Sequence, residues 1–234
     1  MLAKELLPKL MEYSIILPTA GRNDISQACS LAKNRHFACV SVFPCWVPFA
    51  ARQLAGTDVK CSATIGYPYG VDALSVKVYS AQLLTKVGAG EIEVFVNLSA
   101  LKSGDFDVVV AEAEELKDTV TVTGLTHSGE EGMLKLAIPV DYLEPAELAR
   151  LVTTLREVSV DFLTLFFQQP QVEPVTDALR LVRDCVGAEM GIKLMAPTME
   201  ADTALRLADL GANRVGCSNR SEERRVGKEC RSRW

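Results

Sequence analysis

Short runs of apolar and β-branched residues alternate with longer helical stretches along almost the whole chain. This alternation is the strongest constraint on the fold, because it favours parallel strands that are joined by crossover helices. We predict strands at residues 13–17, 38–43, 60–65, 92–96, 134–138, 162–166, 192–195 and 214–216. Between them we predict helices at residues 25–34, 47–54, 71–87, 105–116, 145–157, 172–186 and 198–210.

Eight strands that alternate with helices predict a (β/α)8 TIM barrel of the α/β class, built as one domain over residues 1–219. The length of 234 residues and the hydrophobic content of 48% suit a single core of this size. A doubly wound open sheet would carry a glycine-rich fingerprint after its first strand, and residues 18–21, Pro-Thr-Ala-Gly, are not one. Residues 118–132 fit neither element, and we expect a hairpin or an extended crossover there.

The last fifteen residues, 220–234, differ in character from the rest of the chain. They read RSEERRVGKECRSRW and hold six basic and three acidic residues, which leaves a net charge of −8 on residues 1–219. A basic tail on an acidic body usually suggests nucleic-acid or membrane binding. This string resembles the translation of a sequencing adapter and has no apolar period, so we interpret it as a non-native tail. It begins where the eighth helix should start, and we expect no nucleic-acid partner.

The rest of the sequence also excludes several classes of protein. No apolar run reaches the roughly 18 residues that span a membrane, and residues 1–13 predict a short amphipathic helix rather than a secretion signal. Seven cysteines are scattered without metal-ligand spacing, and the only histidines are His36 and His127. We therefore expect reduced thiols, a cytoplasmic location, no membrane partner, and no metal or other cofactor.

Four polar residues fall on or just after predicted strands, where a barrel carries its reactive groups: Glu93, Lys135, Lys193 and Ser218. A lysine inside an apolar strand is costly unless it is paired, and burial near a second cation makes its amine nucleophilic. Two lysines and a carboxylate are the parts of a Schiff-base aldolase. The alternatives are a structural ion pair of Glu93 with either lysine, and a plain helix cap at Ser218.

Three longer segments carry a family resemblance. Residues 37–47 read FACVSVFPCWV, residues 59–70 read VKCSATIGYPYG, and residues 88–97 read GAGEIEVFVN; LKSGD at 101–105 continues the match. In order and spacing they resemble deoxyribose-phosphate aldolase, over nearly the whole chain up to Ser218. The resemblance implies a (β/α)8 barrel and a class I aldol cleavage of 2-deoxyribose 5-phosphate to acetaldehyde and glyceraldehyde 3-phosphate. It also implies a lysine imine, no metal, and a homodimer.

The resemblance assigns roles to individual residues. Glu93 falls where the family has the aspartate of its proton relay, and Lys135 and Lys193 fall where it has auxiliary lysines. Gly216 and Ser218 fall in its phosphate-binding Gly-x-Ser turn.

The sequence also departs from the family at the central positions. The imine lysine is replaced by Thr164 within DFLTLFFQ at 161–168, and a hydroxyl cannot form an imine. The Lys-x-x-Gly-Gly loop of strand seven has become KLMAP at 193–197, where proline lacks an N–H for the phosphate. Strand five has Pro139-Val140 in place of Glu-Thr, and the first strand lacks the expected aspartate, with Tyr13 near its place.

We therefore favour an aldolase-like barrel that no longer performs the parent reaction and instead binds a metabolite or a protein partner. The metabolite would be a small phosphorylated sugar or an aldehyde. The alternative is an active class I aldolase that uses Lys193 or Lys135 as its nucleophile and Glu93 as its proton shuttle. An open cavity around Thr164 would favour the alternative, whereas filling by Phe166, Phe167 and Met195 would oppose it.

The tail generates the first testable prediction. We expect this chain to fold poorly or to aggregate. Without an eighth helix, the helices on either side of it and the first and eighth strands would leave apolar surface uncovered. Replacing residues 220–234 by a native C-terminal helix should restore a cooperative thermal melt, followed by circular dichroism. Equally cooperative melts of the two chains would contradict this prediction.

Overall fold

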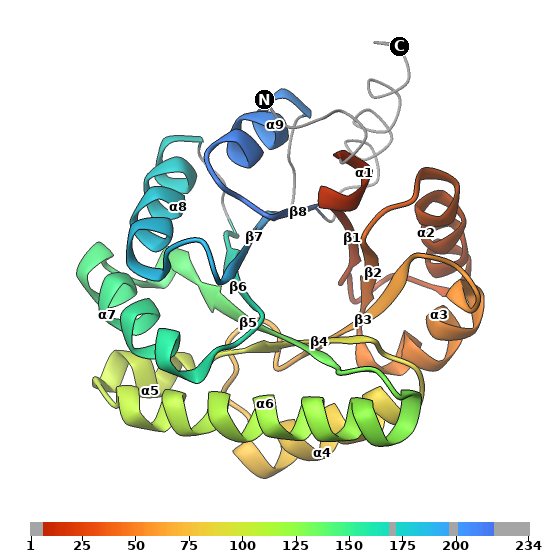
Figure 1. Ribbon diagram of the computed structural model, residues 1–234, viewed down its shortest axis with the longest axis horizontal. Helices are drawn as coiled ribbons and strands as arrows, with labels where there is room; N and C mark the ends of the chain where they lie inside the picture. Colours follow the sequence, from red (N-terminus) through yellow and green to blue (C-terminus); the bar gives the residue numbers. More distant parts are fainter. Residues whose placement is uncertain (1–6, 169–171, 197–200, 218–234) are drawn as a thin grey trace.

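The computed structural model describes residues 7–168, 172–196 and 201–217. Its strands form one closed parallel barrel in the order β1 to β8, with β8 paired back onto β1 (Figure 1). This confirms the predicted (β/α)8 fold. The predicted eighth helix, the tail and the boundary at residue 219 lie outside the described residues. Within them, no helix combines the length and the apolar character that a membrane span requires.

The strands lie close to their predicted positions, and four of them, β1, β4, β5 and β7, begin one or two residues earlier. The first includes Met11 and Glu12, and the fourth begins at Glu91. Both additions matter because they bring a glutamate into the barrel wall. The strands are β1 (Met11–Ile15), β2 (Cys39–Val42), β3 (Lys60–Ile65), β4 (Glu91–Phe95), β5 (Met133–Pro139), β6 (Phe162–Phe166), β7 (Gly191–Ala196) and β8 (Arg214–Cys217).

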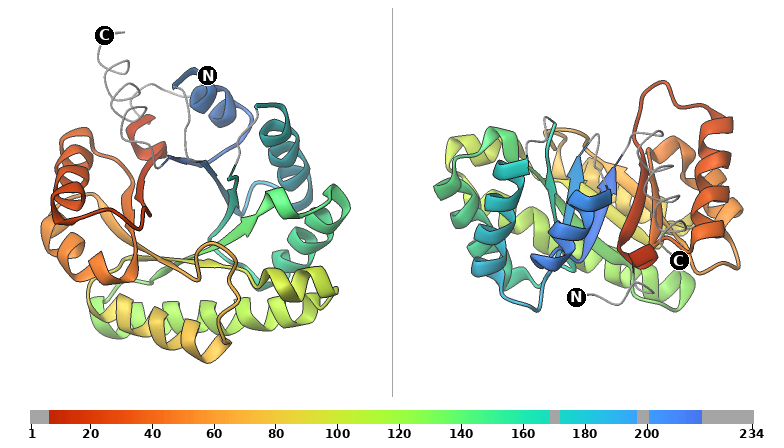
Figure 2. Two further views of the ribbon diagram at one scale, coloured as in Figure 1. Left: turned by 180° about the vertical axis from the view of Figure 1, so that it is seen from behind. Right: turned by 90° about the horizontal axis from the view of Figure 1, so that it is seen from above.

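The helices surround the barrel as an outer layer, which both views along the barrel and the side view show (Figures 1 and 2). Crossover helices cover the apolar outer faces of the strands, as parallel strands require. A short helix, α1 (Leu7–Leu10), precedes β1. The helices that follow are α2 (Arg22–Arg35), α3 (Val47–Leu54), α4 (Leu74–Lys86), α5 (Leu98–Ser103), α6 (Phe106–Ser128), α7 (Pro145–Leu155), α8 (Val172–Val186) and α9 (Ala201–Asp209).

Two local predictions were wrong. Residues 118–132 form neither a hairpin nor an extended crossover, because α6 continues to Ser128. Val120 and Thr123 are buried at helical spacing after Leu116, so tertiary packing overrides the strand propensity of the threonine and valine run. At the other end of the chain, the helix expected over residues 1–13 is described only as α1, since Met11 begins a buried strand.

The strand residues alternate between two environments. Side chains such as Tyr13, Val40 and Leu163 belong to the main apolar core of the protein. Their strand neighbours belong to the barrel interior, where the parallel register places Glu93 beside Lys135 and Thr164 beside Lys193. Because side chains alternate along a strand, residues paired in register face the same side of the sheet. The interior is therefore the polar side of the barrel wall.

A buried ion pair joins the outer helices α4 and α6. α4 packs beside α6, and Lys77 Nζ of α4 lies 3.0 Å from Glu112 Oε2 of α6 (Figure 1). The same ammonium donates to the carbonyl of Phe95 at 3.3 Å. Lys77 has no exposed surface, so its charge depends on these two acceptors.

Removal of one partner of this pair should be strongly destabilising. We expect Glu112→Ala to lower the free energy of unfolding by about 3–5 kcal/mol, because an uncompensated ammonium would remain buried. Urea denaturation measures the change. Glu114→Ala removes an exposed carboxylate from the same helix and should change stability by at most about 0.5 kcal/mol. Equal effects of the two substitutions would contradict the role of the pair.

Candidate functional site

Six charged side chains meet inside the barrel, and we call them the internal charge cluster. Lys135, Lys193, Glu12 and Glu93 have no exposed surface, and Glu91 is 2% exposed. Each cation contacts at least one carboxylate, and the cluster is formally neutral because three carboxylates balance three cations. Buried charges are tolerated when they are paired in this way. The cluster consists of Glu12, Glu91, Glu93, Lys135, Lys193 and Arg214.

Lys193 occupies the centre of the cluster. Its ammonium contacts Glu12 Oε1 and lies 2.7 Å from Glu93 Oε1. The same Glu93 oxygen accepts a hydrogen bond of 2.7 Å from the hydroxyl of Thr164. Gly216 makes room for this arrangement, because a Cβ there would lie 3.2 Å from Lys193 Cε. The position at which the resemblance placed the imine lysine is therefore a hydroxyl donor to the carboxylate that also holds Lys193.

Lys135 and Arg214 share the remaining carboxylate oxygens. Lys135 Nζ lies 2.8 Å from Glu12 Oε2 and 3.0 Å from Glu91 Oε2. Arg214 binds Glu91 with two parallel hydrogen bonds of 2.6 and 2.9 Å, a bidentate geometry that is among the strongest available to a carboxylate. Glu12 thus bridges the two lysines, and Glu91 bridges Lys135 and Arg214.

The pKa values follow from this pairing. Burial alone would raise the pKa of Glu12, but the charges of Lys135, Lys193 and Arg214 outweigh it and hold that pKa below its ordinary range. Burial works against the charged form of Lys135, but the acidic groups around it, Cys39 and the glutamates of the cluster, raise its pKa well above the ordinary value. Lys135 is therefore an ammonium ion at neutral pH and has no lone pair for a carbonyl carbon.

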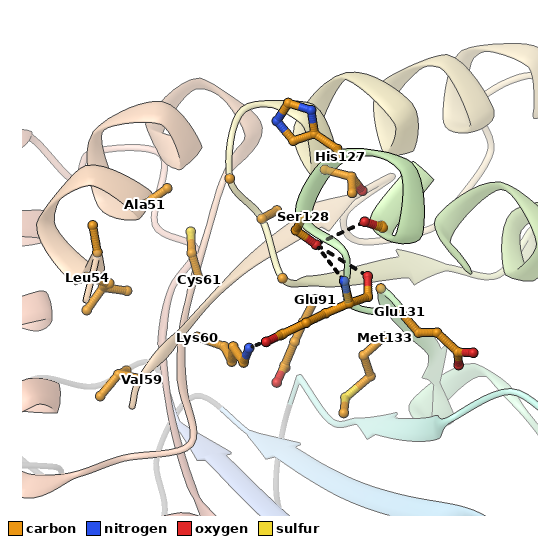
Figure 3. A pocket seen from close by; sticks show the side chains of 18 of the residues that line it. Ala51, Leu54, Val59, Lys60, Cys61, Glu91, His127, Ser128, Glu131 and Met133 are labelled. Carbon is orange, nitrogen blue, oxygen red and sulfur yellow. Dashed lines mark hydrogen bonds and ion pairs between the residues drawn. The ribbon is translucent and has the colours of Figure 1, made fainter. Parts of the chain in front are cut away.

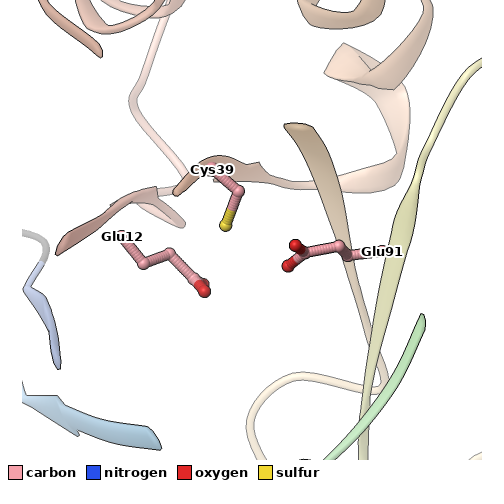
Figure 4. A group of neighbouring side chains, drawn as sticks. All are labelled: Glu12, Cys39 and Glu91. Atoms are coloured by element: carbon pink, nitrogen blue, oxygen red, sulfur yellow. The ribbon is translucent and has the colours of Figure 1, made fainter. Parts of the chain in front are cut away.

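Three of the interior side chains have donor atoms that could hold a metal ion. The side chains of Glu12, Cys39 and Glu91 point toward one another from three strands, with ligand atoms within 4.8 Å of each other (Figure 4). Lys135 Nζ lies among them, 4.0 Å from the sulfur of Cys39 as well as at ion-pair distance from both carboxylates. A lysine ammonium therefore supplies the positive charge that a cation would bring to this position.

Apolar and aromatic side chains cover the charge cluster toward the C-terminal ends of the strands, and we call them the aromatic cap. Phe95 and Phe166 pack edge to face with ring centroids 5.2 Å apart, and the ring of Tyr67 contacts both at 5.4 and 5.6 Å. Such aromatic pairs add to the stability that burial provides. The cap consists of Ile16, Phe43, Tyr67, Phe95, Ala137, Phe166 and Met195.

The sequence analysis named Phe166, Phe167 and Met195 as residues that could fill the space around Thr164. Phe166 and Met195 do lie over Thr164 within the barrel, and both are at most 3% exposed. Phe167 does not join them, because its side chain belongs to the main core between strands and helices. The residues beneath the cap keep unused hydrogen-bonding capacity: Ser14 Oγ, Ser62 Oγ and Glu93 Oε2 are buried without a hydrogen-bond partner in the described structure.

The structure thus brings Glu93, Lys135, Lys193 and Thr164 together in the barrel interior. Gly216 lies beside Lys193 in the interior, and Ser218 lies outside the described residues. The first strand was expected to lack the aspartate of the family, with Tyr13 near its place. The structure instead begins this strand at Met11, and its Glu12 supplies a carboxylate that contacts both interior lysines.

Sequence reasoning also missed Glu91 and Arg214. The two-residue period of Glu91, Glu93 and Phe95 could have indicated that these three side chains share the interior face.

A cavity of about 420 Å³ opens at the other end of the barrel, and the sequence did not indicate it (Figure 3). Lys60, Glu91 and Met133, which line it, are the first residues of their strands. Lys60 Nζ bridges to Glu130 Oε2 at 2.8 Å across its edge (Figure 3). Burial, together with neighbouring acidic groups, raises the pKa of the Cys61 thiol in its wall to about 12, so this cysteine is a poor nucleophile.

Comparison with known proteins agrees with this architecture. The chain is 31% identical over 212 residues to the deoxyribose-phosphate aldolase of Thermoanaerobacter sp., a match that covers 91% of this chain and 92% of that protein. It is 30% identical over 212 residues to the deoxyribose-phosphate aldolase of Enterococcus faecalis, with 91% and 93% covered. The chain matches no family profile.

Solved structures share the fold. The aldolase QR15 superposes with a TM-score of 0.81 at 23% identity, covering 97% of this chain and 96% of its own. A tetrameric deoxyribose phosphate aldolase from Aeropyrum pernix gives a TM-score of 0.83 at 18% identity, with 100% and 94% covered. Fold and interior together define an aldolase-type (β/α)8 barrel with lysines and carboxylates inside it. The chain belongs to the deoxyribose-phosphate aldolase family.

The lowered pKa of Glu12 predicts how stability depends on pH. A carboxylate with a depressed pKa stabilises the fold above the ordinary glutamate pKa of 4.5, and this contribution is lost as the pH falls toward the folded-state value. We expect Glu12→Gln to lower the free energy of unfolding by about 3–5 kcal/mol at neutral pH. We also expect the free energy of unfolding of this variant to fall less steeply with decreasing pH below 4.5.

Denaturation at a series of pH values measures both effects. Glu157→Gln changes an exposed glutamate and should leave both the stability and its pH dependence as they are. A Glu12→Gln protein as stable as the unsubstituted chain would show that the cluster does not depend on this carboxylate.

Proposed function

We propose that this chain is a deoxyribose-phosphate aldolase-like protein that has lost the imine chemistry of its family and has a binding or scaffold role. One observation carries the proposal: both interior lysines are fully buried and each is held by two carboxylates, while a threonine stands at the predicted imine position. A class I aldolase needs a neutral amine that faces the carbonyl carbon of its substrate.

The surroundings of the lysines support the same conclusion. Lys135 is protonated, and attack on a carbonyl would first require the loss of its proton and of both ion pairs. The aromatic cap lies between Thr164 and the C-terminal mouth, the end at which barrel enzymes bind their substrates. The imine lysine, the loop after strand seven and the Glu-Thr of strand five are all replaced in this chain, and catalytic groups that act as a unit lose their effect together.

The proposed ligand is a metabolite related to that of the family, a small phosphorylated sugar or an aldehyde, or else a protein partner. Gly216 and Ser218 are the residues that the family resemblance offers for a phosphate. The lack of a membrane-spanning helix among the described residues, and the free thiols of Cys29, Cys39 and Cys61, are consistent with a cytoplasmic location.

An active class I aldolase remains the second candidate, because one contact favours it. Lys193 pairs in register with Thr164, and both side chains contact the same oxygen of Glu93. An amine at Lys193 would therefore lie one strand from the family position, with a carboxylate in place to move the proton. Lys135 on β5 is the other lysine that could act as the nucleophile in this alternative.

Borohydride trapping separates the two candidates. The chain is incubated with 2-deoxyribose 5-phosphate or acetaldehyde, reduced with borohydride, digested and mapped by mass spectrometry. We expect no adduct at Lys135 or Lys193, because neither amine is accessible or free of its carboxylates. The Thermoanaerobacter relative treated in parallel provides the positive control, and the exposed Lys60 reports the background of non-specific reductive alkylation.

An adduct at either interior lysine above that background would overturn the proposal. Lys193→Met and Lys135→Met would then identify the nucleophile, since only one of them should abolish both the adduct and the cleavage of 2-deoxyribose 5-phosphate.

A further inference from the structure

The cavity at the N-terminal ends of the strands lies at the opposite end of the barrel from the aromatic cap, and we call it the basal cavity. It is enclosed by the C-terminal parts of α3, α4 and α6 and by the first residues of β3, β4 and β5 (Figure 3). Its volume of about 420 Å³ falls within the roughly 300–1,000 Å³ that is usual for small-molecule sites. The function proposed for the barrel interior makes no use of this space.

Much of the wall of the basal cavity is apolar. Ala51 and Leu54 of α3 lie with Val59 on one side of it, and Met133 lies on the other (Figure 3). Ala89, which precedes β4, also lines it. A bare metal ion would find few oxygen ligands along such a wall, whereas a hydrocarbon chain would be removed from water by it. The wall therefore favours a ligand with an aliphatic body.

The charged side chains around the basal cavity have an excess of negative charge. Among the described residues that line it, the carboxylates are those of Glu91, Glu130 and Glu131, and the one lysine or arginine is Lys60. The charge of Glu91 is compensated inside the barrel by the cations of the internal charge cluster. Two glutamates thus remain against one lysine, which favours a cationic ligand over an anionic one.

Three helix C-termini act in the same direction. α3 ends at Leu54, α4 ends at Lys86 and α6 ends at Ser128, and Leu54, Thr85 and Ser128 line the cavity. A helix C-terminus carries a partial negative charge of about half an elementary charge, which stabilises a nearby cation. The basic residues in the last turns of α3 and α4, Arg52 and Lys86, are exposed and do not line the cavity.

An ammonium group of the chain itself already occupies the polar edge of the basal cavity. Lys60 Nζ lies 2.8 Å from Glu130 Oε2 (Figure 3), and the stem of Lys60 passes close to Gly90, where a Cβ would lie 3.3 Å from Lys60 Cδ. The side chains of Lys60 and Glu130 are 54% and 73% exposed, and ion pairs at such exposure contribute little to stability. A second ammonium could therefore replace Lys60 beside Glu130 at little cost.

We propose that the basal cavity binds a small aliphatic amine in its ammonium form. The ammonium of the ligand takes the place of Lys60 Nζ beside Glu130, and its hydrocarbon chain lies along the apolar wall. The proposal is independent of the function proposed for the barrel interior, because neither Lys60 nor Glu130 belongs to the internal charge cluster.

Probes of equal chain length and different charge test the class of ligand. Titration calorimetry of the folded full chain with hexylamine should show saturable binding. Hexanol has no charge and should bind at least about 10-fold more weakly, because hydrogen bonds between charged groups are stronger than neutral ones. Hexanoate should not bind, since its carboxylate would meet charges of its own sign. Hexanoate that binds as tightly as hexylamine, or hexylamine without saturable binding, would overturn the proposal.

Matched variants test the position of the ligand. Glu130→Gln should weaken the binding of hexylamine at least about 10-fold. Glu157→Gln makes the same change at an exposed glutamate that does not line the cavity, and it should leave the binding as it is. Lys60→Met keeps an apolar stem but removes the competing ammonium, so it should tighten the binding about two- to fivefold.

Thermal melts confirm that the three variants fold. A Glu130→Gln protein that binds hexylamine as tightly as the unsubstituted chain would contradict the proposed contact. Weaker binding of hexylamine by Lys60→Met would contradict the proposed replacement of Lys60.

Discussion

The ion pairs between Glu12 and the two interior lysines are the interaction on which the rest of the barrel interior depends. A barrel of this size has room inside only for side chains, and here most of those side chains are charged or hydroxylated. Such an interior is stable only if each charge is compensated, and Glu12 compensates Lys135 and Lys193 at once. The bidentate pair of Arg214 with Glu91 completes the balance.

The same pairing constrains the two interior lysines. In a Schiff-base aldolase, a lysine must lose its proton and meet a carbonyl group, whereas here Lys135 and Lys193 are buried and paired with carboxylates beneath Phe95 and Phe166. Thr164 fits this arrangement because its hydroxyl donates to Glu93, whereas a lysine in its place would bring a second ammonium to this carboxylate beside that of Lys193. Under the proposed loss of imine chemistry, the threonine at the imine position and the aromatic cap belong to one change, in which packing and ion pairs replace a reactive lysine.

The two faces of α4 in the outer layer also differ in character. The inner face of α4 holds a buried ion pair with α6, which fixes the two helices together, while its outer face remains apolar.

The sequence by itself determined the fold and the polar character of the interior. Alternating strands and helices predicted the barrel, and lysines and glutamates inside apolar strands identified Glu93, Lys135 and Lys193. It did not reveal Glu12, because the residues before Tyr13 have a helical pattern and the strand that contains them forms only through pairing with β2 and β8. Only the tertiary structure decided which charges meet, since Lys193 and Glu12 are 181 residues apart in the sequence and become neighbours when the barrel closes. The same holds for α6, where burial at helical spacing outweighed a local preference for strand.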